Sequence, residues 1–217
     1  MDFAAARFNM VESQIRTNNV VESGTLRALS STPRELFLPR RMRGYAYADE
    51  DLPLGRGRVM IEPLVMARLL QAAAIRSSDV VLAIGDATGW GSAVLSKLAS
   101  TVVSLECDGA LAAAAAATLS EQGVDNVAVM TGDLSVGYPA QAPYDVILFL
   151  GAVAEIPEGI AAQLADGGRL VAVVAHGPGG GAGTRLTRMG AVLGRDTPFD
   201  AATPFLPGLE PKPVFRF

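Results

Sequence analysis

Two carboxylates and several glycines follow apolar runs in the middle of the chain. The run that starts at residue 80 ends at Gly85, and the next run ends on Glu106, about twenty residues later. A third run is followed by Gly132 and Asp133. Glycines let the backbone approach a ligand closely, and an acid at the tip of the following strand can accept both hydrogen bonds of a ribose diol. This spacing indicates a nucleotide-cofactor site.

The turn after the first run decides between two cofactors. A dinucleotide fingerprint requires glycine at positions 85, 87 and 90, but Ala87 and Trp90 occupy two of them. An S-adenosylmethionine site needs no pyrophosphate cradle, so that Glu106 would bind the ribose and Asp133 the adenine amino group. Taken alone, Glu106 is at least as well explained as a solvated strand end, and Asp133 as a turn former. The order of several such strand ends favours S-adenosylmethionine over NAD.

The predicted cofactor-binding residues all lie at or just after the ends of these apolar runs. They are Gly85, Asp86, Ala87, Gly89, Glu106, Cys107, Gly132, Asp133 and Leu134. The chain has a single cysteine and a single histidine, Cys107 and His176, so the sequence predicts neither an internal disulfide nor a Cys/His metal site. Trp90 is expected either to line the pocket or to belong to the core.

The composition is that of a globular protein with a large core. The chain has 217 residues, 50% of them hydrophobic and 18% charged. Its net charge of −4 argues against a nucleic-acid partner. No apolar run reaches the ~18 residues of a membrane helix and the first residues lack a secretory pattern, so we expect a cytoplasmic protein with no membrane partner. The oligomeric state stays open.

Apolar runs alternate with helical segments from residue 79 onward. Predicted strands are Val80–Gly85, Thr101–Glu106, Asn126–Thr131, Tyr144–Leu150 and Arg169–Ala175, and the helices between them are Trp90–Ala99, Ala110–Gly123 and Pro157–Ala165. Strands that are apolar throughout and alternate with helices predict an α/β fold, a doubly wound, mostly parallel, Rossmann-like sheet with helices on both faces.

The two ends of the chain differ from this middle part. Residues 1–75 contain the predicted helices Ala5–Val20, Thr25–Ser31 and Glu62–Ala74. Together with the acceptor loop, we expect this part of the chain to cover the carboxyl edge of the sheet. Residues 76–217 would form the cofactor-binding core, and both parts would make one domain. Near the other end, a glycine-rich hairpin or loop at Gly177–Gly183 should precede late strands, including Thr184–Met189, and an ordered tail.

Several segments, in order, resemble one known family. They are MVESQIR (10–16), PRELFLP (33–39), YADEDLPLG (47–55), APYDVI (142–147), IP (156–157) and GRLV (168–171). Together they resemble the protein-L-isoaspartate O-methyltransferases. The resemblance implies a class I methyltransferase fold with an N-terminal helical addition. It also implies a protein-repair activity: transfer of the methyl group of S-adenosylmethionine to the carboxylate of isoaspartyl residues in damaged proteins or peptides.

The chain departs from the family in the loop that receives the methyl acceptor. The usual Gly-Gln-Thr-Ile-Ser is Gly-Arg-Val-Met-Ile at residues 57–61, so that Val59 and Ile61 replace both hydroxyl side chains. We therefore expect isoaspartyl peptides to be methylated poorly. No catalytic residue is assigned; the candidates in this loop are Arg58, Val59 and Ile61. Arg56 and Arg58 could grip a carboxylate, or could belong to an ordinary solvated loop.

The cofactor turn departs from the family as well. Ala83 replaces the usual acid before the first glycine and Ala87 replaces the second glycine, although Asp86 could take over the role of the acid. Methyl transfer to an ionised carboxylate needs alignment and exclusion of water and no general base, so a lack of histidine is compatible with an enzyme. The alternative is a catalytically impaired or silent methyltransferase-fold protein that acts as a binding or interaction module.

Overall fold

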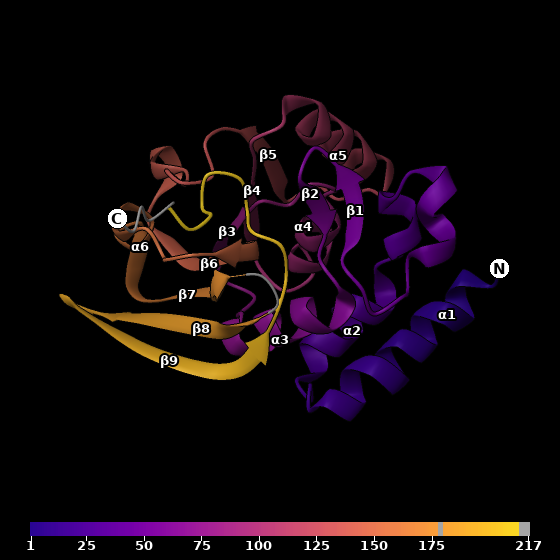
Figure 1. Cartoon of the computed structure of the whole chain (residues 1–217), viewed down its shortest axis with the longest axis horizontal. Helices are drawn as coiled ribbons and strands as arrows, with labels where there is room; N and C mark the ends of the chain where they lie inside the picture. The colour runs from indigo at the N-terminus through magenta and orange to yellow at the C-terminus, as the bar shows by residue number, and fades with distance from the viewer. Residues whose placement is uncertain (178–179, 213–217) are drawn as a thin grey trace, which may run out of the picture.

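A single large sheet runs through the molecule (Figure 1). The computed structural model describes residues 1–177 and 180–212. The strand order is β5-β4-β3-β6-β7-β8-β9. The parallel strands are β3 (Val80–Ile84), β4 (Thr101–Glu106), β5 (Val127–Thr131), β6 (Tyr144–Val153) and β7 (Leu164–Gly177). The antiparallel strands β8 (Gly180–Met189) and β9 (Val192–Ala201) complete one edge.

The prediction of a mainly parallel sheet is confirmed. β3 and β4 are adjacent and parallel, with Val80 opposite Thr101 and Ile84 opposite Leu105. The chain then leaves β5 at one edge and returns beside β3 as β6, so the strand order reverses at β3. In open sheets of this kind, ligands bind at the carboxyl ends of the strands beside such a reversal. The end of β3 is Ile84, directly before the predicted cofactor turn.

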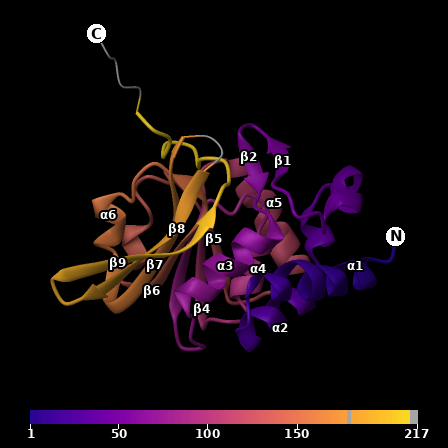
Figure 2. The ribbon, with the colours of Figure 1, turned by 60° about the horizontal axis from the view of Figure 1, so that its bottom comes forward.

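Both faces of the central strands β3, β4 and β6 are buried, which explains why these strands are apolar throughout. Val81 and Ala83 enter one core, and the alternate residues Leu82 and Ile84 enter the other. Successive side chains of a strand point to opposite faces, so each strand contributes to both cores. Figure 2 shows α6 (Glu158–Ala161) on one side of the sheet and the helices α1 to α4 on the other.

The crossover helices are present but shorter than predicted. They are α4 (Trp90–Leu95), α5 (Gly109–Glu121) and α6. Beyond Leu95 the chain continues in tighter turns, in which Lys97 N donates to the carbonyl of Val94. After α6 the chain soon becomes extended, since β7 begins at Leu164. Within the described residues, no helix has both the length and the apolar character needed to cross a bilayer.

The N-terminal part is helical, as predicted, but also contains a hairpin. Helix α1 (Phe3–Asn9) continues through a wider π turn and a 3-10 turn to Asn18, and α2 (Ser23–Ser31) and α3 (Pro63–Ala73) follow. Two 3-10 segments and the antiparallel pair β1 (Leu52–Gly55) and β2 (Arg58–Met60) lie between α2 and α3.

Helix α3 packs on a face of the sheet and is fixed there by two arginines. Arg169 donates from Nε to the carbonyl of Ala73 at 3.0 Å and from Nη2 to that of Ala74 at 2.8 Å. Arg185 Nη1 donates to the carbonyl of Ala72 at 3.2 Å. The last carbonyls of a helix have no partner within the helix. Side chains of the last strands therefore complete α3.

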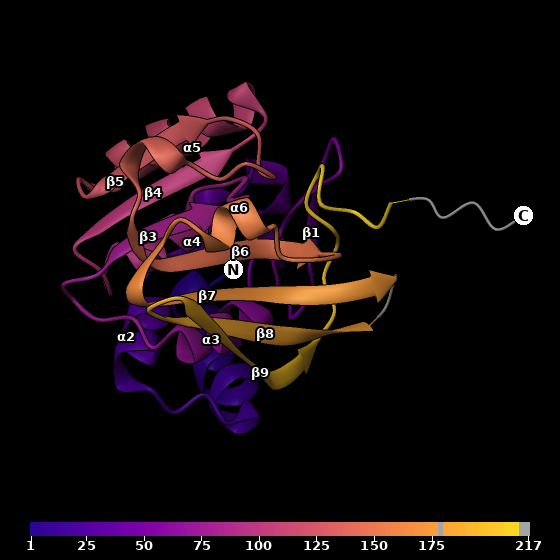
Figure 3. The same cartoon turned by 90° about the vertical axis from the view of Figure 1, so that its left-hand side faces the viewer.

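The cover over the carboxyl ends of the strands comes from two parts of the chain. Figure 3 shows β1 and the segment that follows β9 at the ends of β6 and β7, whereas α2 and α3 lie to the side of the strands. Helix α3 contacts β6, β7, β8 and β9. In the segment after β9, Phe205 forms a parallel bridge with Ala152 of β6. The hairpin, which lies within residues 1–75, and this late segment cover the predicted site.

The glycine-rich stretch Gly177–Gly183 takes the hairpin form of the two forms expected for it, because β7 and β8 pair antiparallel with Gly177 opposite Gly180. Residues 178–179 lie outside the described residues, but β8 begins at Gly180. A Cβ atom at Gly183 would lie 2.2 Å from Cζ of Phe199, so this glycine leaves room for a ring on the neighbouring strand. The late strands themselves are confirmed; the end of the predicted tail, 213–217, also lies outside the described residues.

Candidate functional site

Glu106, the predicted ribose acceptor, lies at the carboxyl end of β4 and is completely buried. Its Oε1 accepts from the amides of Cys107 at 2.9 Å and Asp108 at 3.0 Å. Both Glu106 oxygens also accept from Arg58, from Nε at 3.2 Å and from Nη2 at 2.7 Å. The carboxylate is therefore saturated with partners from the protein itself.

Arg58 reaches Glu106 from strand β2 of the hairpin. Its side chain is 3% exposed, and its Nη2 also donates to the carbonyl of Gly85 at 2.7 Å. The solvated alternative is therefore wrong for Arg58, and its guanidinium grips a carboxylate of the protein. Arg56, at the tip of the hairpin, is 73% exposed and pairs with Asp108 at 2.8 Å. Its place fits the solvated alternative.

Asp86 directs its carboxylate at the start of α4. Its Oδ1 accepts from the amide of Gly89 at 3.0 Å and its Oδ2 from the amide of Ser92 at 2.6 Å. Burial raises the pKa of this carboxyl, and the amide hydrogen bonds oppose the rise. Asp86 therefore holds the first turn of α4, and Ala87 beside it is buried. Gly89 has a φ of +83°, which favours glycine.

The predicted adenine-binding residues follow β5. Gly132 donates its amide to the carbonyl of Glu106 at 3.1 Å, so the two strand ends are neighbours. Asp133 is exposed, and its Oδ1 accepts from the amide of Ser135 at 2.8 Å and from its hydroxyl at 2.7 Å. These bonds lower the pKa of Asp133. Leu134 is buried in the core.

Cys107 is one of the predicted cofactor-binding residues, and His176 is the single histidine of the chain. Cys107 is exposed, and its thiol donates to Oε1 of Glu106 at 3.3 Å. Partial burial and the neighbouring carboxylate raise the pKa of this thiol, which makes it a weaker nucleophile. His176 is exposed, near the end of β7.

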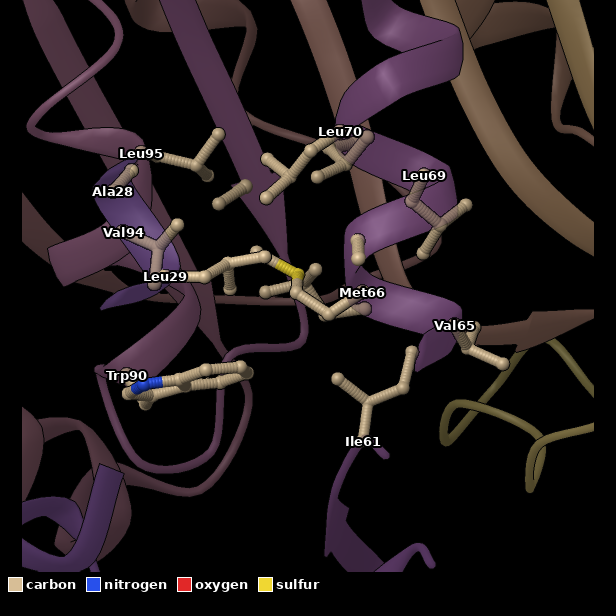
Figure 4. Packing of buried hydrophobic residues seen from close by; sticks show 14 of the residues in the cluster. Ala28, Leu29, Ile61, Val65, Met66, Leu69, Leu70, Trp90, Val94 and Leu95 are labelled. Atoms are coloured by element: carbon tan, nitrogen blue, oxygen red, sulfur yellow. The ribbon is translucent and has the colours of Figure 1, made fainter. Parts of the chain in front are cut away.

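The two apolar positions of the acceptor loop lie in different surroundings. Val59 is half-buried, whereas Ile61 is 4% exposed. Figure 4 shows Ile61 pointing into the core, towards Met66 and the side of the Trp90 ring. Trp90 is itself 1% exposed, so it belongs to the core. At position 61 the altered residue therefore contributes to packing and is closed to solvent.

The sequence did not reveal the buried arginine that joins the acceptor loop to the cofactor turn. Arg34 is fully buried, with its guanidinium 4.2 Å from the centre of the Trp90 ring. It donates to the carbonyls of Ala46 and Ile61, both at 2.7 Å. Burial lowers its pKa to about 9. The one feature of the sequence that pointed to Arg34 was its position in segment 33–39, which resembles the family.

A second residue that the sequence did not reveal, Leu206, lies against the glycines at the strand ends. A Cβ atom at Gly85 would be 2.4 Å from Cδ2 of Leu206, and one at Gly151 would be 2.7 Å from the same atom. Leu206 is 1% exposed. The close approach that Gly85 permits is therefore used by a leucine of the same chain.

Little space remains where the cofactor is expected. The cavity at the turn measures about 10 Å³ and is lined by Val59, Met60, Ile61, Gly85, Asp86, Ala87, Thr88, Trp90, Gly91 and Leu150. Pockets for small ligands enclose roughly 300–1,000 Å³. A cavity of about 400 Å³ touches Ala87 and Thr88 from the side of α5, but it reaches neither Glu106 nor Asp133. The cavity that touches Gly85 and Asp86 is therefore much smaller in this structure than a typical small-ligand pocket.

Comparison with known proteins gives the family. The family model described as protein-L-isoaspartate(D-aspartate) O-methyltransferase matches residues 6–181. Protein-L-isoaspartate O-methyltransferase 1 of Rhodopseudomonas palustris (strain HaA2) is 41% identical over 186 residues, which are 86% of this chain and 76% of that protein. Protein-L-isoaspartate O-methyltransferase of Koribacter versatilis is 41% identical over 169 residues, 78% of this chain and 76% of that one.

Solved structures agree on the fold. A protein-L-isoaspartate O-methyltransferase superposes with a TM-score of 0.78 at 24% identity, covering 95% of this chain and 66% of that one. A putative protein-L-isoaspartate O-methyltransferase from Plasmodium falciparum, in complex with S-adenosyl-L-homocysteine, gives 0.76 at 14% identity, covering 94% and 97%. From its sequence and its sheet, the chain belongs to the protein-L-isoaspartate O-methyltransferase family, whose members depend on S-adenosylmethionine.

Proposed function

We propose that the protein is an S-adenosylmethionine-dependent carboxyl O-methyltransferase that acts on isoaspartyl residues of proteins or peptides. The family match over residues 6–181 carries this proposal, because it spans both the N-terminal part with the acceptor loop and the strands of the predicted cofactor site. Relatives that bear this name are about 41% identical over most of the chain. The proposed place of action is the cytoplasm, and the proposed role is protein repair.

Roles for the site residues are part of the same proposal. Glu106 would accept the ribose hydroxyls and Asp133 the adenine amino group, since both lie at neighbouring strand ends. The remaining cofactor-binding residues would be Gly85, Asp86, Ala87, Gly89, Cys107, Gly132 and Leu134. Of the acceptor-loop candidates, Val59 is more accessible than Arg58 or Ile61. We propose one domain, in which residues 1–75 cover the core formed by residues 76–217.

One observation favours a second function, that of a silent member of the family that acts as a binding or interaction module. The proposed ribose acceptor, Glu106, is already bound on both oxygens by Arg58. A cofactor would have to displace a buried ion pair before it could use this carboxylate.

Transfer of a radiolabelled methyl group separates the two functions. The intact protein is incubated with labelled S-adenosylmethionine and with one of two peptides, identical except that one contains isoaspartate and the other aspartate. The proposed enzyme labels the isoaspartyl peptide alone, and base-labile label in that peptide identifies a methyl ester. No label in either peptide, at saturating cofactor and with a family member as positive control, would instead favour the silent module.

A further inference from the structure

Two side chains from opposite ends of the chain meet at the carbonyl end of β3. Arg58 Nη2 donates to the carbonyl of Gly85 at 2.7 Å. If Gly85 carried a Cβ atom, that atom would lie 2.4 Å from Cδ2 of Leu206. The first side chain comes from the hairpin before α3 and the second from the segment after β9. Together they fill the place where the proposed function requires the cofactor.

Arg58 is held in place by its ion pair with Glu106 as well as by the packing around it. Arg58 and Glu106 are buried together, with side-chain exposures of 3% and 0%. Each guanidinium nitrogen that faces Glu106 takes one carboxylate oxygen, an arrangement that a ribose diol would otherwise adopt. A bound ribose and the observed Arg58 therefore compete for the same acceptor atoms.

Leu206 is held in place by its backbone. Its amide donates to the carbonyl of Ala152 at 2.8 Å, and the amide of Ala152 donates to the carbonyl of Pro204 at 2.9 Å. These bonds add a short parallel bridge to the end of β6. Gly151 faces the same side chain: a Cβ atom built on Gly151 would lie 2.8 Å from Cγ of Leu206.

We infer that Arg58 and Leu206 form an internal plug that keeps the cofactor site closed, and that both must move out before S-adenosylmethionine or its demethylated product binds. This inference rests on the proposed function, since it assigns the cofactor to these strand ends. The open state is a minor population. A ligand that binds that population alone shows an affinity reduced in proportion to its fraction.

Binding of S-adenosylhomocysteine, measured by calorimetry, tests the plug without any turnover. Arg58→Gln introduces the residue typical of the family loop, and Leu206→Ala removes the side chain above the glycines. An open state populated at 10% or less predicts that the double variant binds about 10-fold or more tightly than the original protein. Leu209→Ala is the matched control. Leu209 is buried in the same segment, and its backbone carbonyl accepts from the amide of Ala154. Because the substitution keeps this backbone bond, removal of the Leu209 side chain should not open the site.

Hydrogen exchange on the unaltered protein provides a readout that does not depend on the variants folding. Ligands usually protect backbone amides. Here an excess of S-adenosylhomocysteine should instead speed exchange at the amides of Leu206 and Ala152, because the bridge must open for the ligand to enter.

The outcomes distinguish the plug from the function on which it rests. Tighter binding by the double variant, with faster exchange at Leu206 in the original protein, supports the plug. Equal affinity in both proteins, with Leu206 still protected, overturns the plug and leaves the enzyme proposal standing. Absence of binding in both proteins, each shown by circular dichroism to be folded, overturns the proposed function and the plug with it.

Discussion

Replacing Glu106 by glutamine tests whether the buried ion pair is as closed to water as the structure indicates. The change removes the charge that compensates Arg58, whose side chain is 3% exposed and would keep a neutral amide and the carbonyl of Gly85 as its partners. Loss of one member of a buried pair typically costs about 3–5 kcal/mol, because the other charge stays buried. Total stabilities are about 5–15 kcal/mol, so the loss should be large and easily measured.

A double-mutant cycle isolates the interaction free energy between Arg58 and Glu106. Arg58→Met combined with Glu106→Gln removes both charges and retains much of the volume, so it should cost far less than Glu106→Gln alone, and the coupling should be at least about 2 kcal/mol. Urea unfolding followed by circular dichroism gives the four free energies. Arg56→Gln is the control, since Arg56 is 73% exposed in its pair with Asp108 and its loss should leave the urea midpoint unchanged. If Glu106→Gln shifts the midpoint no more than this control, the guanidinium reaches water and the argument fails.

Two further predictions concern the carboxyls beside the site. Burial, reinforced by Asp51 and then Asp49, raises the pKa of Glu62 to about 7, so Glu62 favours the folded state below its unfolded pKa, and this contribution is lost as the pH rises towards 7. Glu62→Gln should therefore raise the melting temperature at pH 8 but hardly at pH 4.5; a pH-independent difference would contradict this reasoning. Asp86→Ala leaves the amides of Gly89 and Ser92 buried without their acceptor, and should cost about 1–3 kcal/mol in urea unfolding; an unchanged unfolding curve would show that water replaces the carboxylate.

Much of the fold could be predicted because both faces of the central parallel strands are buried. This requirement gives continuous apolar runs such as Val80–Ile84, which are recognisable without any partner strand. The ends of helices were less predictable. Residues 162–165 continue a helical pattern, but the pairing of Leu164 with Tyr144 imposes an extended backbone. In β8, the glycines that suggested a loop accommodate Phe199, and a ring on another strand leaves no local signal.

The candidate site was predictable in its residue types and not in its contacts. Gly85 and Glu106 do lie together at neighbouring strand ends. Their partners come from far away in the sequence, since Arg58 precedes Glu106 by 48 positions. Leu206 lies in a segment without a recognisable motif. No spacing rule relates such residues. The sequence therefore indicated that Gly85 and Glu106 could bind a ligand, but not that Arg58 and Leu206 of the same chain contact them.

The completion of α3 by Arg169 and Arg185 has a consequence for the order of events during synthesis. The carbonyls of Ala73 and Ala74 accept from Arg169, which lies 96 and 95 positions later in the chain. The carbonyl of Ala72 accepts from Arg185, 113 positions later. Both arginines leave the ribosome when most of the chain is already outside. Until then the end of α3 depends on water, and the helix cannot dock permanently on strands that do not yet exist. The end of α3 is therefore synthesised early and gains its last hydrogen-bond partners late, once β7 and β8 have been made.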